Sequence, residues 1–233
     1  MKLYFSPLAC SLASRIALYE SGIEASYVEV DLRQRRTADG QSYLELHPLG
    51  LVPLLELEGG ERLSENVAIL SYIAERGERG SANDALRRAR LNEALGFIST
   101  ELHKALYTPL LDENASAEAK AYALSKAESR LAELERRLSG REFVLAQFSV
   151  ADAYLFAILN WSRVTPVDLG PWPSLRAYQA KLLQRPAFAR AFGEERALYF
   201  ERSAERRAPA SGNSAGAPRA GHPATRVDPD CTA

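Results

Sequence analysis

Strand patterns are confined to the first third of this chain, and this restricts the folds open to it. Two short runs, residues 2–5 and 27–30, are rich in aromatic and β-branched residues and flank a segment, 11–21, with helical spacing. From Asp84 onward the apolar residues recur only at helical spacing. The pattern predicts a small α/β domain followed by an all-helical domain.

The first of these domains is expected to begin with a βαβ unit, whose two strands are parallel because a helix connects them. A short helix should follow, and then a third strand that begins at a proline. The glycine pair Gly59-Gly60 is typical of a hairpin turn, and a helix should close the domain. These later elements are predicted at residues 41–46, 52–57, 62–63 and 67–76.

The second domain is predicted to contain long helices, of which the segment 149–161 is almost wholly apolar and should be buried. We place the domains at 1–79 and 84–200, with a linker at 77–83. The last segment, 208–233, contains four prolines and a single large aliphatic residue, Val227, so it is predicted to be a disordered tail. The helices are expected at 86–104, 116–138, 149–161, 175–184 and 187–199.

Charge and cysteine content exclude several classes of protein. Lys and Arg number 29 against 30 Asp and Glu, so the net charge of −1 speaks against a strongly basic nucleic-acid binder. The two cysteines, Cys10 and Cys231, suit a reducing compartment, and they and the three histidines lack the spacing of zinc ligands. No apolar run approaches the roughly 18 residues of a membrane span. We therefore expect a cytoplasmic protein without metal, membrane or nucleic-acid partners.

The first candidate for chemistry is the pair Cys10-Ser11, between the first strand and the first helix. Free N–H groups at a helix N-terminus favour a nearby thiolate, and serine is a good N-cap. A buried cysteine can equally be a small apolar filler, and this feature alone does not decide between the two interpretations.

Two further motifs come before helices or strands in the same domain. Val52-Pro53 is a candidate cis peptide that would turn the backbone N–H and C=O of Val52 outward, although a trans edge proline is the alternative. Ser64-Glu65-Asn66 stands at a helix start, where anions bind, and Glu65 could pair with an ammonium group. The alternative there is a plain helix cap. A fourth motif, Ser149 to Asp152, is a capping box with a structural role.

In this order and spacing, the four motifs resemble the soluble glutathione transferases over roughly residues 1–200. Three segments are similar to motifs of the bacterial beta class. They are Ala9-Cys10-Ser11-Leu12-Ala13-Ser14, Thr100-Glu101-Leu102-His103-Lys104 and Ala151-Asp152-Ala153-Tyr154-Leu155-Phe156.

The resemblance implies a thioredoxin-like N-terminal domain, an all-α C-terminal domain, a homodimer, and glutathione as co-substrate. Glutathione would bind with its γ-glutamyl end at Glu65 and Asn66 and its cysteinyl backbone at Val52. Its glycine carboxylate would lie near Arg35, where the beta class usually has lysine. The sulfur would lie by Cys10, with three further residues nearby: Ser11, His103 and Lys104.

Catalytic roles are implied for Cys10, Ser11 and His103, although a lone histidine on a long helix can also serve packing. Thr100 and Glu101 fall in the same helical stretch and are expected to line the site, from their own chain or from across the dimer interface.

The sequence departs from the family at several positions. Phe5 stands where the family often has tyrosine, and Tyr4 should face the opposite side of the strand because side chains alternate. A tyrosine is therefore not expected to contact the sulfur, so its stabilisation would depend more on Cys10 and Ser11. Leu8 stands where glycine is common.

The predicted reaction is the conjugation of reduced glutathione to a hydrophobic electrophile. Two alternatives stay open: a thiol–disulfide or peroxide reductase, in which Cys10 would act as a single thiol because position 13 is Ala13, and a non-catalytic ligand-binding protein. The sequence does not define the acceptor. Four aromatic residues are candidates for its pocket or for packing: Tyr107, Phe156, Trp161 and Trp172.

Overall fold

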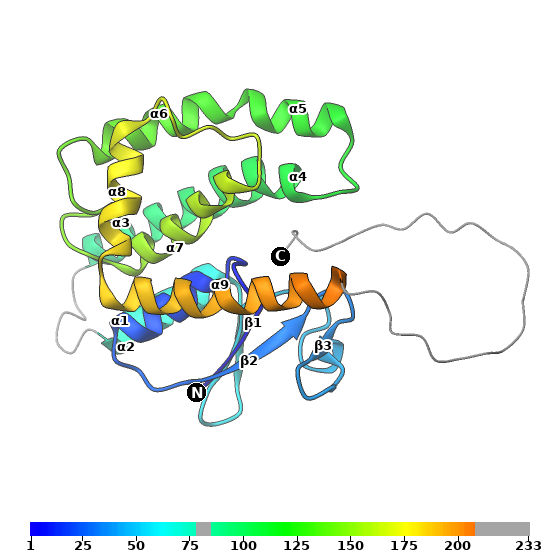
Figure 1. Cartoon of the computed structure of the whole chain (residues 1–233). Coiled ribbons are helices and arrows are strands. Elements are labelled where there is room, and N and C mark those ends of the chain that lie inside the picture. Colours follow the sequence, from blue (N-terminus) through cyan, green and yellow to red (C-terminus); the bar gives the residue numbers. More distant parts are fainter. Residues whose placement is uncertain (78–84, 208–233) are drawn as a thin grey trace, which may run out of the picture.

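The computed structural model describes residues 1–77 and 85–207, which form a sheet-bearing half and a helical half (Figure 1). All strands of these residues lie before residue 65. The fold is a thioredoxin-like mixed sheet with helices, followed by an all-α unit, as predicted. The predicted tail at 208–233, and all of the predicted linker except Gly77, lie outside the described residues.

The sheet has the order β3-β2-β1-β4-β5. Strand β1 pairs in parallel with β2 across helix α1 and antiparallel with β4, and β4 forms a hairpin with β5. This confirms the predicted βαβ unit and hairpin. The third predicted strand is shorter than expected and starts after Pro53. The elements are β1 (Lys2–Phe5), α1 (Leu12–Glu20), β2 (Ser26–Asp31), β3 (Arg36–Thr37), β4 (Leu54–Glu56) and β5 (Arg62–Ser64).

Alternation along β1 divides its side chains between two apolar clusters. Leu3 and Phe5 join the main core, which continues into the helical half, whereas Tyr4 packs with Tyr43 on the other face. The Tyr4 side chain therefore points away from the start of α1, as the alternation predicted. The predicted short helix at 41–46 is a single 3₁₀ turn, Tyr43–Glu45.

The remaining helices cover the sheet and form the second half of the molecule. They are α2 (Asn66–Gly77), α3 (Ala85–Phe97), a π-helix (Ile98–Tyr107), α4 (Thr108–Leu111), α5 (Ala117–Ser125), α6 (Ala127–Leu138), α7 (Val150–Leu159), a 3₁₀ turn (Asn160–Arg163), α8 (Pro173–Leu183) and α9 (Pro186–Arg207). None of these described helices is long and apolar enough to cross a bilayer.

Three of the predicted helices differ from the structure. The helix expected at 187–199 continues to Arg207 as α9. The helix expected at 116–138 breaks at Lys126, after a turn in which the Ser125 hydroxyl donates to the Tyr122 carbonyl at 2.7 Å and so competes with the backbone ladder. The helix expected at 86–104 turns from α3 into the π-helix after Phe97. Apolar spacing did not reveal this change, because both kinds of helix can bury the same leucines.

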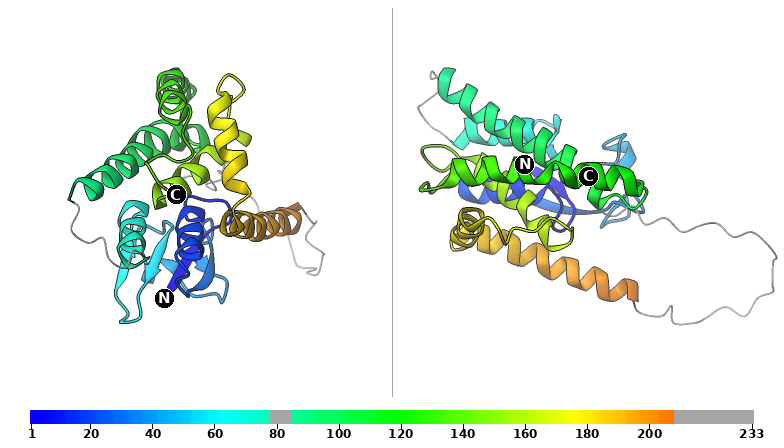
Figure 2. Two further views of the ribbon diagram at one scale, coloured as in Figure 1. Left: turned by 90° about the vertical axis from the view of Figure 1, so that its left-hand side faces the viewer. Right: turned by 90° about the horizontal axis from the view of Figure 1, so that it is seen from above.

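The two halves share one core, and α7 and α9 join them. Every residue of α7 is buried, and the helix packs against α1 and α2. Helix α9, orange in Figure 1, runs alongside α1. Ion pairs fasten it to the first half, among them Arg202 of α9 to Glu29 at 2.9 Å; Arg185, directly before α9, pairs with Glu20 through bonds of 2.8 and 2.7 Å. Figure 2 shows the helical half stacked over the sheet-bearing half.

Candidate active site

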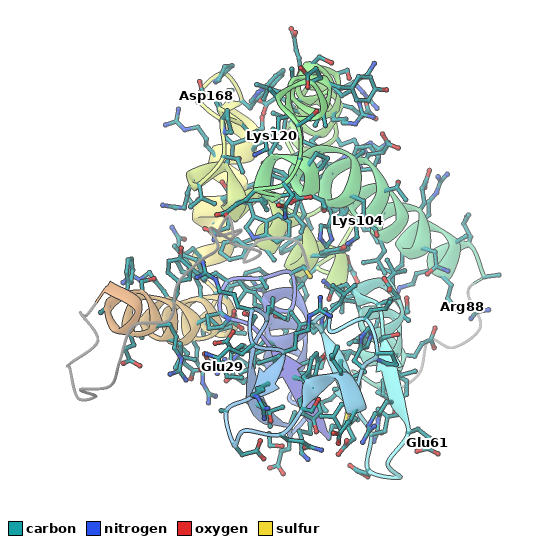
Figure 3. The ribbon with its side chains drawn as sticks, turned by 90° about the vertical axis from the view of Figure 1, so that its right-hand side faces the viewer. Glu29, Glu61, Arg88, Lys104, Lys120 and Asp168 are labelled. Atoms are coloured by element: carbon teal, nitrogen blue, oxygen red, sulfur yellow. The ribbon has the colours of Figure 1, made fainter. Side chains whose placement is uncertain are left out.

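A pocket lies where the start of α1 faces the π-helix, between the two halves. It encloses about 400 Å³ together with the solvent at its mouth. Figure 3 shows Lys104 on the π-helix at the level where the two halves meet. In the described part of the chain, no three His, Cys, Asp or Glu side chains gather in a way that could hold a metal ion. The pocket is lined by Cys10, His47, Leu51, Val52, Pro53, Glu65, Asn66, Ser99, His103, Lys104 and Tyr154.

Cys10 is the sulfur-bearing residue of this pocket, and its thiol is buried. The Sγ atom donates to the carbonyl oxygen of Val52 at 3.3 Å. Burial raises the pKa of the Cys10 thiol to about 12, against the smaller lowering effects of Lys104 and of the backbone N–H groups of Cys10 and Ser11. Of the two interpretations that the sequence left open, burial favours the apolar one for Cys10 itself, because desolvation of the thiol outweighs the helix dipole.

Ser11 stands next to Cys10, but its side chain points elsewhere. The Ser11 hydroxyl accepts from the N–H of Ser6 and donates to its carbonyl, each at 3.2 Å, and Ser11 is fully buried. Ser11 occupies the N-cap position of α1, as predicted, but its side chain makes no capping bond to the helix. The expected catalytic role of the Ser11 hydroxyl is not supported either. This hydroxyl fixes the loop before Cys10, and Ser11 does not line the pocket.

The helical half holds this loop at Leu8. The indole N–H of Trp161 donates to the Leu8 carbonyl at 3.0 Å, and the Leu8 N–H donates to the buried carboxyl of Glu195 at 2.8 Å. Leu8 has a φ of 61°, in the left-handed region that favours glycine. This backbone conformation explains why glycine suits the position, and the two bonds from the helical half hold leucine there.

Glu65 and Asn66 form the end of the pocket at the start of α2. Glu65 is exposed and has a φ of 68°, so its carboxylate is open to a ligand. Asn66 is buried: its Nδ2 donates to the Cys10 carbonyl at 2.8 Å, and its Oδ1 accepts from the Ser14 hydroxyl at 2.9 Å. The Asn66 side chain thus fixes the turn that carries the thiol, and Asn66 also lines the pocket.

Val52 and Pro53 form the side of the pocket nearest the sheet. The Val52-Pro53 peptide is cis, which confirms the sequence-based candidate. The Val52 carbonyl faces the pocket region, since it accepts the Cys10 thiol. The nearby His47 side chain accepts the N–H of Leu51 through Nδ1 at 3.4 Å.

The π-helix supplies the opposite side. His103 is buried, with its Nδ1 2.8 Å from the hydroxyl oxygen of Tyr154 and its ring edge-on to Trp161 at a centroid distance of 5.0 Å. Lys104 is exposed, and its positive charge acts to lower the pKa of Cys10. Ser99, His103 and Lys104 all line the pocket.

Three predicted residues lie off the pocket in this chain. The Cγ and Cδ atoms of Arg35 lie beside Gly50, the neighbour of pocket-lining Leu51, but Arg35 does not itself line the pocket. Thr100 donates to the Gly96 carbonyl at 3.0 Å, and Glu101 forms a 2.6 Å ion pair with Arg130 of α6. The expectation that Thr100 and Glu101 line the pocket of their own chain is therefore wrong.

The aromatic candidates for an acceptor pocket are mostly committed to packing. Phe156 packs edge-on against Phe188 in the core, and Tyr107 packs against Trp161; Trp172 is partly buried against the same core. Sequence reasoning missed Tyr154, Ser99 and His47 as lining residues. Tyr154 lies inside the segment quoted for the family resemblance and Ser99 lies just before another, but neither residue carried a signal of its own.

The fold and this thiol-bearing pocket define a thioredoxin-like protein with a helical second domain. Residues 1–75 match the family described as Glutathione S-transferase, N-terminal domain, and residues 97–186 match Glutathione S-transferase, C-terminal domain. A relative named glutathione S-transferase GstA, from Escherichia coli O157:H7, is 35% identical over 199 residues, which is 84% of this chain and 98% of that one.

Solved structures agree with this assignment. A sphingomonad glutathione S-transferase complexed with glutathione has a TM-score of 0.79 and 43% identity, and a bacterial beta class glutathione S-transferase from Sphingomonas chungbukensis has 0.79 and 40%; each comparison covers 84% of this chain and 98% of the other. The chain therefore belongs to the glutathione S-transferase family. The predicted resemblance to the beta class is confirmed.

Proposed function

We propose that this glutathione transferase conjugates reduced glutathione to hydrophobic electrophiles at the pocket between its halves. One observation carries the proposal: a single pocket joins the Cys10 thiol, the Val52 backbone and the exposed Glu65 carboxylate. An extended tripeptide with an ammonium group at one end and a thiol in the middle needs these groups in one groove. The relatives named glutathione S-transferase, one of them solved with glutathione, support the same activity.

In the proposed complex, glutathione lies in the pocket in one orientation. The γ-glutamyl ammonium would pair with Glu65, and its carboxylate would accept from the N-terminal N–H groups of α2. The cysteinyl N–H would bond to the Val52 carbonyl. The glycine carboxylate would then point toward Gly50, beside which Arg35 lies, and the guanidinium fork of arginine suits a carboxylate.

The reaction requires the thiolate of glutathione, because the thiolate is the nucleophile and a free thiol has a pKa of about 8.5. A site that lowers this pKa by about two units stabilises the thiolate by roughly 2.7 kcal/mol. The backbone N–H groups at Cys10 and Ser11 and the Lys104 ammonium favour an anion at this point, as their effects on Cys10 show. The thiolate then attacks the electrophilic carbon, and the leaving group departs with its electron pair.

The buried state of Cys10 argues against a reductase that works through Cys10. A thiol with a pKa of about 12 is almost entirely protonated at neutral pH, so it is a poor nucleophile toward a disulfide. The sulfur of glutathione, bound nearer to solvent, keeps access to the same favourable N–H groups. Conjugation therefore fits the geometry better.

Binding and turnover test the proposal together. We expect the full chain to bind immobilised glutathione, to elute with free glutathione, and to convert a chromogenic aryl halide in a glutathione-dependent reaction. Binding without turnover would favour a non-catalytic ligand-binding protein. Failure of both, in a protein that circular dichroism shows to be folded, would overturn the proposal.

We further propose a homodimer, the domain division at 1–79 and 84–200, and a cytoplasmic location. The two family matches, to 1–75 and 97–186, support the division. The exposed position of Thr100 on the π-helix leaves it available to a partner subunit. The free thiol of Cys10 suits a reducing compartment. Light scattering, limited proteolysis between the domains and cell fractionation would test the three statements.

A further inference from the structure

His47 lines the pocket beside Leu51 and Val52, although it belongs to none of the motifs that the sequence analysis identified. Its side chain is 8% exposed, and its ring stacks on that of Tyr43 with an interplanar angle of 11° and a centroid distance of 6.2 Å. Both residues belong to the segment between β3 and β4. The stacking holds the His47 ring in one plane at the wall of the pocket.

The hydrogen bonds of this segment define which nitrogen of the His47 ring carries the proton. The Leu51 N–H donates to the His47 Nδ1 at 3.4 Å, and the Tyr43 hydroxyl donates to the Leu51 carbonyl at 2.8 Å. A backbone N–H can only donate, so Nδ1 accepts and bears no proton. A neutral imidazole has one N–H, which is therefore at Nε2. His47 is thus a hydrogen-bond donor through Nε2.

The Nε2 atom of His47 faces open space. Within residues 1–77 and 85–207, the side-chain N and O atoms that are enclosed without a hydrogen-bond partner belong to Arg15, Tyr107 and Glu195. Nε2 is not among them, and the hydrogen bond that the His47 ring makes within these residues is the one at Nδ1. The open space that His47 lines is the pocket. The donor is therefore available to a ligand bound there.

The β4–β5 ladder indicates which end of glutathione would reach this donor. Leu54 pairs with Ser64 in this antiparallel ladder, so the segment that enters β4 runs beside the segment that leaves β5 at Glu65. Going back along the chain from β4, Val52 comes first and His47 follows. A tripeptide with its γ-glutamyl ammonium at Glu65 and its cysteinyl group at Val52 therefore brings its glycine toward His47.

We propose that His47 binds the glycine carboxylate of glutathione through its Nε2–H, as a neutral donor whose tautomer is fixed by the Leu51 N–H. This inference rests on the proposed function, because it names the contact made by one end of the co-substrate. Arg35 does not line the pocket, so the donor that the glycine end meets inside it is His47. A hydrogen bond to a charged group is stronger than one to a neutral group. His47 therefore favours a tripeptide that ends in a free carboxylate over one whose end is blocked.

Nitrogen-15 NMR of the histidine-labelled full chain, without glutathione, tests the tautomer. At pH 8.5 an ordinary imidazole is neutral, and the chemical shifts of its two nitrogens show which one is protonated. The signals of His47 are those that disappear in His47→Asn. We expect the Nε2–H form in the wild type. An Nδ1–H ring in the wild type overturns the proposal, whether or not any variant folds.

Two substitutions separate the donor at Nε2 from the bond to Leu51. In His47→Asn the amide oxygen can replace Nδ1 as the acceptor, but no donor remains at the place of Nε2. In His47→Gln the longer side chain can bring an N–H to the place of Nε2, but the Leu51 N–H loses its acceptor. By titration calorimetry, Kd for glutathione should rise about tenfold in His47→Asn and less than about threefold in His47→Gln. The reverse order would show that His47 acts by fixing the turn, and would overturn the proposal.

Glutathione esterified at its glycine carboxyl identifies the group that meets His47. The ester keeps the γ-glutamyl and cysteinyl groups but lacks the negative charge at the glycine end, so the bond from Nε2 is weaker. We expect His47→Asn to raise Kd for the ester about twofold or less, against about tenfold for glutathione. Equal rises for the two ligands would show that His47 does not meet the carboxylate, and would overturn the proposal.

Tyr43→Phe is the matched control for the fold of this segment. It removes the bond from the Tyr43 hydroxyl to the Leu51 carbonyl but keeps a ring for His47 to stack on. We expect Kd for glutathione to stay within about twofold of the wild type. If Tyr43→Phe raises Kd as much as His47→Asn does, the loss of a rigid turn explains both results and the assigned contact is wrong.

These binding measurements use no electrophile, so they separate this inference from the proposed function. A wild type that shows the expected order of Kd values but does not convert the aryl halide would refute the proposed function alone. Unaltered glutathione binding by His47→Asn, beside normal conversion of the aryl halide, would refute only the role of His47. A folded wild type that binds no glutathione would refute both.

Discussion

The Cys10 thiol donates to the Val52 carbonyl at 3.3 Å, and this carbonyl is the acceptor that the cysteinyl N–H of glutathione needs in the proposed complex. The protein's own thiol and its substrate would therefore meet at one oxygen atom, whose two lone pairs can accept both donors. In this complex the Cys10 S–H group could turn from the carbonyl to donate to the sulfur that lies beside it. Cys10 would then assist the reaction as a proton-bearing neighbour of the nucleophile.

Replacement of Cys10 by alanine should leave conjugation largely intact. We expect KM for glutathione to change little, because the Val52 carbonyl can accept the cysteinyl N–H with or without the thiol, and kcat to fall about tenfold or less, because one weak donor is lost. Cys10→Ser keeps a donor and should lie closer to the wild type. A loss of kcat by a factor of about a thousand would instead make Cys10 the nucleophile.

Alkylation should report the buried thiol directly. With a pKa of about 12, Cys10 should react slowly with iodoacetamide at pH 7, and its rate should rise about tenfold for each pH unit up to pH 10. The measurement uses Cys231→Ser, which leaves one thiol, and mass spectrometry to locate the adduct. A rate that levels off below pH 9 would contradict the assigned effect of burial.

Glu65→Gln should weaken glutathione binding and spare the chemical step. The change removes a charged partner of the γ-glutamyl ammonium, which is worth about 1.5 to 3 kcal/mol, so KM for glutathione should rise roughly 10- to 100-fold while kcat changes little. Glu61→Gln is the control, because Glu61 is an exposed glutamate at the tip of the β4–β5 hairpin, far from the pocket (Figure 3). Equal effects of both changes would argue against the placement of the ammonium.

Glu195 should make stability fall as the pH rises. Burial raises the pKa of this carboxyl to about 8, although the N–H of Leu8 and the charge of Arg15 act to lower it. In the unfolded chain the pKa of a glutamate is about 4.3. Between these values the folded state holds a proton that the unfolded state has released, so its stability decreases from about pH 4.5 to 8. Glu195→Gln keeps an acceptor for Leu8 and does not titrate.

Thermal unfolding of the two proteins between pH 5 and 8 gives the measurement for Glu195. The wild type should lose Tm relative to Glu195→Gln as the pH rises, and the two should be most alike at pH 5. If the Tm of the wild type instead rises relative to that of Glu195→Gln as the pH increases, Glu195 is ionised and paired with Arg15.

Asp152→Ala should destabilise the fold without changing the pocket. The fully buried Asp152 accepts from the N–H groups of Val144 and Ser149 and from the Tyr178 hydroxyl, each at 2.8 Å. Its removal leaves buried donors without acceptors, so the free energy of unfolding should drop by about 3 kcal/mol or more. Urea denaturation measures this loss. KM for glutathione in the folded fraction should match the wild type, and Ser149→Ala should cost less, about 1 kcal/mol.

The sequence predicted the order of elements well, because apolar spacing and turn residues act locally. It predicted the pocket residues Cys10, Val52 and Glu65 through motifs that stand at the ends of elements. It did not predict the direction of the Ser11 hydroxyl, which depends on the close approach of Ser6. It left open whether Cys10 is buried, since burial depends on how distant segments pack together. The π-helix and the contact of Tyr154 with His103 are likewise products of tertiary structure.

The two bonds that hold Leu8 have a consequence for recombining parts of such chains. Trp161 and Glu195 reach the same residue from separate helical segments, one on each side of its peptide unit. A chimera that took its first 77 residues from this chain and its remainder from a distant relative would keep every residue of the tripeptide groove on the sheet side. It would nevertheless lose the shape of the turn before Cys10, unless the relative also carried a tryptophan and a glutamate at the positions of Trp161 and Glu195.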